Sequence, residues 1–204
     1  MAIPQKTIFI ISAVLLTLLS VSCLSAQTSG TELPVPDGLE FEIVDGRNVT
    51  ITKYNGNAVT VNIPARIQGL PVTVIHNSAF DSCRNLTSIA IPSSVTSIGN
   101  SAFRLCRNLT SIAIPSSVTS IGIWAFVSCY NLTSITIPSS VTFIGEMAFA
   151  FCDSLTSVTI PSSVVFIGNG AFAECVSLKS VTISRNTQIG RYAFPEMTQI
   201  IYRD

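Results

Sequence analysis

The stretch Ile98–Ser120, IGNSAFRLCRNLTSIAIPSSVTS, decides the fold, because the chain repeats it with few changes. The copy that follows directly, Ile121–Phe143, reads IGIWAFVSCYNLTSITIPSSVTF. Related copies occupy 75–97, 144–166 and, one residue shorter, 167–188, and a partial copy fills 189–204. A fixed period of this length is typical of solenoids, in which each copy forms one coil and stacks on its neighbours.

The first half of a copy predicts a short strand. Leu109, Ile112 and Ile114 point one way and the residues between them point the other, which is the pattern of a half-buried strand. Pro115 ends this strand because it has no N–H to give to a neighbour. Strands of successive coils should therefore pair in parallel, about 4.8 Å apart.

The second half of a copy predicts a change of direction. A second extended piece ends at Ile121, and Gly122 is expected to adopt a backbone shape that a β-carbon disfavours. The residues Trp124–Cys129 read as a helical turn with Phe126 and Cys129 on one face. Stacking then predicts one buried column of phenylalanines: Phe80, Phe103, Phe126, Phe149 and Phe172.

The residues before the repeats follow another rhythm and predict a cap at 39–74, which merges into a partial first repeat. Alternating apolar residues and the turn signals Asp45-Gly46 and Asn55-Gly56 predict three antiparallel strands. We expect these strands at Glu40–Val44, Val49–Tyr54 and Ala58–Ile63, covering the open end of the first coil. Five repeats would then fill 75–188, and 189–204 would form a C-terminal partial repeat ending in a strand at Ile200-Ile201-Tyr202.

Residues 1–38 predict export. Residues 1–26 have one charge, Lys6, and an apolar run at Ile8–Leu19 that is short for a membrane span of about 20 residues. Residues 27–38 are polar and read as a flexible linker. The run leads into Leu19-Ser20-Val21-Ser22-Cys23, which resembles a bacterial lipoprotein cleavage box with the Leu one position further out than usual. Lipidation of Cys23, cleavage by an ordinary signal peptidase near Ser22 or Ala26, and a retained anchor all remain open.

The repeat also resembles a known family. The pattern L-x-x-I-x-I-P-x-x-V-x-x-I-G-x-x-A-F-x-x-C, seen from Leu109 to Cys129, is similar to the BspA-like leucine-rich repeats of bacterial surface proteins. The resemblance covers Leu39–Asp204. It implies a curved right-handed solenoid, mainly β with short helical turns, a parallel sheet and an N-terminal β-hairpin cap. It also implies a protein that is exported to the cell surface or outer membrane, or secreted, and used for adhesion. The ligand differs between members and does not carry over.

Five cysteines recur at one repeat position, always one repeat length apart, which is a spacing that no zinc pattern uses. Their side chains should run parallel, which favours a buried thiol ladder over disulfides. The ladder comprises Cys83, Cys106, Cys129, Cys152 and Cys175. The single histidine, His76, has no carboxylate or strained serine placed beside it, and no phosphate loop or cluster of metal ligands is present. We therefore expect no catalytic residues, no metal and no cofactor.

Two surfaces are candidates for binding. The residue after each cysteine varies and should form a rim that, with the nearby Trp124, offers the anchors that protein interfaces prefer. The rim candidates are Arg84, Arg107, Trp124, Tyr130 and Asp153. The alternative is the outward face of the strands, which carries hydroxyl groups at Ser111, Ser134, Thr136, Ser157 and Thr159.

Charge is sparse, with 11 basic and 11 acidic residues in 204, so no global field favours nucleic acid. Residues 75–120 carry three arginines against Asp81, and 121–180 carry Lys179 against three acids. This dipole would orient an incoming partner or, alternatively, favour head-to-tail association.

The leading hypothesis is a surface module that binds an extracellular protein, with a possible lipid tether to the membrane. A structural spacer or assembly subunit of the envelope, and an ice- or crystal-binding surface, remain as alternatives.

Overall fold

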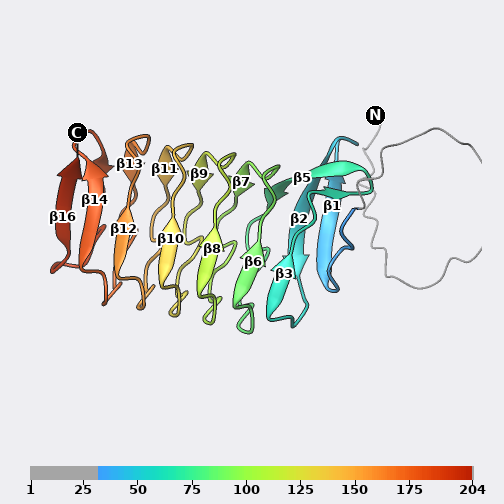
Figure 1. The fold of residues 1–204 in the computed structure, drawn as a ribbon, viewed down its shortest axis with the longest axis horizontal. Helices are drawn as coiled ribbons and strands as arrows, with labels where there is room; N and C mark the ends of the chain where they lie inside the picture. Colours follow the sequence, from blue (N-terminus) through green and yellow to red (C-terminus); the bar gives the residue numbers. More distant parts are fainter. Residues whose placement is uncertain (1–31, 204) are drawn as a thin grey trace, which may run out of the picture.

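The computed structural model describes residues 32–203, which form one solenoid of stacked coils (Figure 1). This described part has sixteen strands and no helix, and therefore none that could cross a membrane. The predicted leader, Cys23 and the start of the predicted linker lie outside it. The strands are β1 (Leu39–Val44), β2 (Asn48–Tyr54), β3 (Thr60–Asn62), β4 (Arg66–Ile67), β5 (Leu70–Ile75), β6 (Ser88–Ala90), β7 (Ser97–Ile98), β8 (Ser111–Ala113), β9 (Ser120–Ile121), β10 (Ser134–Thr136), β11 (Phe143–Ile144), β12 (Ser157–Thr159), β13 (Phe166–Ile167), β14 (Ser180–Ser184), β15 (Gln188–Ile189) and β16 (Gln199–Arg203).

Each full repeat contributes one strand to each of two sheet faces. The first face has the order β1-β2-β5-β7-β9-β11-β13-β15, with β4 beside β5. The second face has the order β3-β6-β8-β10, followed by β12-β14-β16. Strands of successive repeats pair in parallel with equivalent residues opposite, as Ile98 is to Ile121 and Ser111 to Ser134. The predicted parallel solenoid is confirmed.

The predicted helical turn at Trp124–Cys129 is wrong. Trp124 and Ser128 have positive φ values of 57° and 61°, which a right-handed helix does not contain. Alternate amides, among them that of Phe126, donate to the next coil, with Phe126 N 2.7 Å from Ala148 O. Every second amide of the turn thus bonds to the next coil and stabilises the stack. These bonds offset the free-energy cost of holding residues other than glycine in the left-handed backbone region. Phe126 and Cys129 do share the buried side, as expected.

The phenylalanine column is confirmed. All five predicted rings are 0% exposed, and neighbouring ring centres lie 5.0 to 5.2 Å apart. The column also extends beyond the five. Tyr54 stacks on Phe80 at the N-terminal end, and Phe194 stacks on Phe172 at the C-terminal end, each at 5.4 Å. The aromatic core therefore runs through the cap as well as the repeats.

Gly122 serves another purpose than the one expected from the sequence. Its φ does not lie in the left-handed region, so conformational freedom is not the reason for a glycine here. A β-carbon on Gly122 would lie 2.6 Å from the carbonyl carbon of Gly99 in the preceding coil. The equivalent glycines form a line along which the coils approach too closely for any side chain.

The N-terminal cap differs from the three antiparallel strands predicted. β1 and β2 do form an antiparallel hairpin, but β2 also pairs in parallel with β5, which places Ile51 opposite Ile75. The third strand, β3, pairs in parallel with β6 instead of with β2. Since the chain from Tyr54 to Thr60 crosses between the two faces, Asn55-Gly56 does not close a hairpin. The cap is a complete coil, β2 and β3, covered by one extra strand, β1.

Candidate binding surfaces

The predicted rim residues that follow the cysteines stack from one coil to the next. The amide of Asn131 donates to the carbonyl of Arg107 at 3.2 Å, and that of Ser154 donates to the carbonyl of Tyr130 at 3.1 Å. Arg84 and Arg107 are exposed, and Tyr130 is half-buried. The Arg107 guanidinium carbon lies 5.6 Å from the centre of the Tyr130 ring, a cation–π contact that holds both side chains in place.

The acidic member of the rim, Asp153, is half-buried one coil beyond Tyr130. Burial raises the pKa of its carboxyl group, and the nearby carboxylate of Glu174 raises it further. Both causes favour the neutral form of the carboxyl group. The rim therefore passes from basic at Arg84 and Arg107 to acidic at Asp153.

Trp124 lies apart from these rim residues along the chain. It comes three residues after β9, whereas Tyr130 comes six residues later, beyond the buried Phe126 and Cys129. Trp124 and its neighbour Ile123 are both exposed. Both lie in the turn that follows β9, where the amide of Trp124 donates to the carbonyl of Glu146 in the next coil at 2.9 Å.

An apolar stripe over β11 and β13 is the feature that the sequence reasoning missed. Phe143 lies opposite Phe166 in the sheet, and the two rings stack at 5.5 Å. Phe143 is 39% exposed and Val165 is 60% exposed. We define the apolar stripe as Phe143, Val165 and Phe166. A comparison of equivalent positions could have found it, because Phe143 and Phe166 replace the serines Ser97 and Ser120 of earlier copies.

The hydroxyl surface occupies the second sheet face, where Ser111, Ser134, Thr136, Ser157 and Thr159 are all exposed. Strand pairing stops once on this face, between β10 and β12. A shallow hollow of about 460 Å³ lies there, lined by threonine and serine side chains of both strands, among them Thr136 and Thr159.

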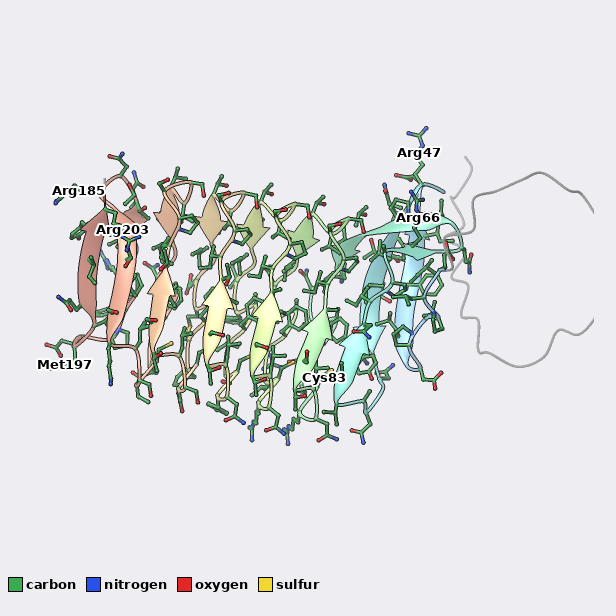
Figure 2. The ribbon with its side chains drawn as sticks, viewed as in Figure 1. Arg47, Arg66, Cys83, Arg185, Met197 and Arg203 are labelled. Carbon is green, nitrogen blue, oxygen red and sulfur yellow. The ribbon has the colours of Figure 1, made fainter. Side chains whose placement is uncertain are left out.

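The structure places the five repeated cysteines in line, and none forms a disulfide. Each of the four buried thiols donates to the carbonyl of a phenylalanine in the preceding coil, as Cys129 does to Phe103 at 3.3 Å. Burial raises the pKa of Cys129 to about 12, so this thiol stays neutral. Cys83 differs because it is only half-buried. It lies near the lower ends of β3 and β6 (Figure 2) and lines a small hollow that also contains Asp81 and Arg84.

The single histidine, and the asparagines that directly follow the rim residues Arg107 and Tyr130, make hydrogen bonds between coils. His76 is exposed, and its backbone amide donates to the carbonyl of Ile51 in the cap at 2.9 Å. Asn131 donates through Nδ2 to Oδ1 of Asn108 at 3.3 Å, so these turn asparagines bond coil to coil. Among residues 32–203, no group of three or more His, Cys, Asp or Glu could hold a metal ion. Cys23 lies outside the described residues.

Fold and sequence together define a leucine-rich-repeat solenoid. The model of the BspA type leucine rich repeat region matches residues 73–201 with six copies, and the chain belongs to this family. No curated protein matches the chain at a significant level.

Solved structures share the fold. A leucine-rich cell surface protein from Faecalibacterium prausnitzii is 32% identical with a TM-score of 0.71, the match covering 85% of this chain and 55% of that one. A leucine-rich repeat protein from Bacteroides ovatus is also 32% identical with a TM-score of 0.71, covering 83% and 52%. The T. pallidum leucine-rich repeat protein is 26% identical with a TM-score of 0.65, covering 81% and 92%. This chain thus spans about half the length of the first two proteins.

Proposed function

We propose that this chain is an exported, surface-tethered module that binds an extracellular protein through the apolar stripe. The observation that carries the proposal is the stacking of two partly exposed rings, Phe143 and Phe166, on adjacent strands next to the exposed Val165. Exposed apolar residues that gather in one place mark interaction sites, whereas isolated ones do not. Each large apolar side chain that a partner covers contributes roughly 1.5–3 kcal/mol when it is fully buried.

The rim is the second candidate surface. Its Arg107 and Tyr130 are preferred interface residues, and their mutual contact orders them before binding, which lowers the entropy cost. However, water hydrates the charged Arg84 and Arg107 favourably when nothing is bound, whereas contact of Phe143 and Val165 with water is unfavourable. The apolar stripe therefore gains more from a partner, and the rim would add specificity through its change of charge.

The surface assignment also fits the printed description of a relative. The F. prausnitzii protein is described as a leucine-rich cell surface protein. If this chain shares that location, its binding partners are proteins of the extracellular medium or of neighbouring cells. An enzymatic role is not proposed, because the described residues bring no nucleophile, base and third orienting group together.

The test is capture of extracellular-matrix and serum proteins on the purified protein, followed by affinity measurement with two variants. The stripe variant carries Phe143→Ser and Phe166→Ser, which restores the residues that Ser97 and Ser120 provide at the same position. The rim variant carries Arg84→Ala, Arg107→Ala and Tyr130→Ala. Both must first melt like the wild type.

We expect the stripe variant to lose at least about tenfold in affinity, or roughly 1.4 kcal/mol, and the rim variant to lose less. A stripe variant within twofold of wild type, with a large loss in the rim variant, would move the site to the rim. If both stay within twofold, the hydroxyl face with Ser134 and Thr136 becomes the better candidate. If no protein is captured, the spacer hypothesis replaces binding, unless thermal hysteresis reveals ice binding.

The proposed tether is tested separately at Cys23. A lipidated protein isolated from cells should partition into detergent, and Cys23→Ser should release it into the aqueous phase. Equal partitioning of both forms would exclude the lipid anchor and leave simple secretion.

A further inference from the structure

The turns of the third, fourth and fifth repeats carry a second group of exposed apolar side chains, which the apolar stripe does not include. Trp124 is 46% exposed, Phe151 is 38% exposed, and Met147 is partly buried. In the copy directly before each ring, the same position holds a serine, Ser101 before Trp124 and Ser128 before Phe151. We define the turn patch as Trp124, Glu146, Met147, Phe151 and Glu174.

Each exposed ring of the turn patch has a glutamate beside it in the next coil. The amide of Trp124 donates to the carbonyl of Glu146 at 2.9 Å, so the backbones of these two residues are in contact. The amide of Phe151 donates to the carbonyl of Ala173, the residue directly before Glu174, at 2.8 Å. Both glutamates are exposed, and within residues 32–203 neither carboxylate forms an ion pair. The turn patch thus repeats one arrangement twice, an exposed ring next to an available carboxylate.

The turns that carry the patch are acidic. Each turn runs from the residue after the buried isoleucine to the residue after the cysteine, which gives 122–130, 145–153 and 168–176. These turns contain three acidic residues, Asp153 being the third, and no lysine or arginine. In the turn directly before them, Arg104 pairs with Asp81, and Arg107 lies over the ring of Tyr130. The turn that follows has one basic and one acidic residue. The patch therefore complements a ligand of positive charge.

Other rings of this protein show what such a ligand provides. The guanidinium of Arg107 lies 5.6 Å from the ring centre of Tyr130, and that of Arg185 lies 5.3 Å from the ring centre of Tyr202. Tryptophan attracts a cation more strongly than tyrosine does. Among the described residues, however, no cation lies over Trp124. A cation supplied from outside fits there, because the ring face attracts it and the neighbouring carboxylate balances its charge.

We propose that the turn patch binds a basic, extended segment of another protein. One arginine or lysine of the segment lies over Trp124 next to Glu146, and a second lies over Phe151 next to Glu174. The side chain of Met147 reaches towards the fifth repeat, since its Cγ lies 3.3 Å from the place of a β-carbon on Gly170. It offers an apolar surface to the methylene stems of the two basic side chains. Two such sites on successive coils favour a ligand whose cations are linked, which is the reason for a protein segment.

The experiment uses the fact that Trp124 is the only tryptophan of the chain. Its fluorescence is measured in the purified protein, with acrylamide as an uncharged quencher. The probe is a short synthetic peptide in which arginine alternates with leucine, and the comparison peptide has glutamate in place of arginine. We expect the basic peptide to protect Trp124 from acrylamide and the acidic peptide to leave it accessible. Protection should weaken with added salt, since the glutamates are exposed.

Two site variants and two controls locate the contact, with affinity measured from the anisotropy of labelled peptide. One site variant carries Glu146→Gln and Glu174→Gln. The other carries Trp124→Ser and Phe151→Ser, and both serines suit the backbone because Ser101 and Ser128 have the same positive φ. Melting curves must first match the wild type. Each site variant should bind the basic peptide at least about tenfold more weakly.

The controls change the same residue types elsewhere and should bind within about twofold of the wild type. Glu42→Gln removes an exposed carboxylate of the cap. The stripe variant, Phe143→Ser with Phe166→Ser, removes two rings from the sheet face. Because it leaves the turn patch intact, this control separates the present proposal from the proposed function of the apolar stripe.

Five results would overturn the proposal. The first is no binding of the basic peptide up to about 1 mM. The second is binding that neither site variant weakens, or that the stripe variant weakens as much. The third is equal protection of Trp124 by the acidic peptide, which would indicate apolar adsorption alone. The fourth is equal protection by the small cation spermidine. The fifth is protection without peptide that grows with protein concentration, which would make a second copy the occupant.

Discussion

The two ends of the solenoid differ in how the apolar surface of the terminal coil is covered. At the N-terminal end, the hairpin of β1 and β2 covers the first coil, and Leu39 and Tyr54 are buried. At the C-terminal end, the equivalent surface is left to a shortened copy of the repeat. β16 begins five residues after Phe194, whereas β14 begins eight residues after Phe172. This last coil leaves Ile189, Ile201 and Tyr202 exposed.

The difference shows what a repeat can and cannot provide. Each coil buries its Phe, Leu and Ile between two neighbours, so a coil with one neighbour is only half stabilised. Sequence outside the repeat closes the N-terminal end, where β1 adds a strand that no copy contains. Nothing comparable lies beyond β16 in the described residues. We therefore expect the ends to differ in stability, in protection and in the neighbours they accept.

The largest expected effect lies in the aromatic column. Phe126→Ala should cost about 3–5 kcal/mol of unfolding free energy, because the ring is buried between two others and leaves a cavity. Phe194→Ala should cost about 1–2 kcal/mol, because that ring is partly exposed and stacks on one neighbour. Urea denaturation measures both. Equal losses would mean that the C-terminal coil is covered in solution, and a loss under about 1 kcal/mol at Phe126 would contradict the buried column.

A second prediction compares hydrogen exchange at the two ends. The amide of Gly190, bonded to the carbonyl of Ile167, should exchange at least about tenfold faster than that of His76, bonded to Ile51. The reason is that opening the last coil breaks contacts on one side only. Mass spectrometry measures the exchange of both amides. If both ends exchange alike, the hairpin gives no more protection than the shortened coil.

A third prediction uses the cysteines as probes along the column. In a Cys23→Ser background, a thiol reagent should modify Cys83 in the native protein, whereas Cys106 and Cys129 should react only on unfolding. The cause is the hollow beside Tyr54 and Asn57, which leaves Cys83 half-exposed at the junction with the cap. Reaction of one thiol per chain before denaturant is added is the expected count. Full protection of Cys83 would show that the cap closes more tightly than the structure indicates.

The smallest expected effect concerns Asp153, midway between the ends. Its raised pKa means that the folded state disfavours the ionised carboxylate. At neutral pH the ionised group therefore imposes a penalty on the stability of the folded state. The penalty disappears as the pH falls below the ordinary value of 3.8, where folded and unfolded chains are both protonated. Asp153→Asn should therefore raise the melting temperature slightly at pH 7 and leave it unchanged at pH 3. A lower melting temperature at pH 7 would mean that the carboxylate has a stabilising partner.

The sequence by itself determined the architecture. A constant repeat length with apolar positions fixed in each copy requires coils of one size that stack with like on like. The parallel pairing, the column from Phe80 to Phe172 and the strand at the C-terminal end all follow from that repetition. These features depend only on which residues recur, and recurrence can be read directly from a single chain.

Only the tertiary structure decided how neighbouring coils meet. The turn at Trp124–Cys129 is not helical because its amides bond to the next coil, a partner that local sequence does not reveal. Gly122 is needed for the approach of Gly99 from the preceding repeat, and β3 joins β6 because stacking outweighs a local hairpin signal. The apolar stripe likewise forms from residues of two coils, which become neighbours only when the solenoid is built.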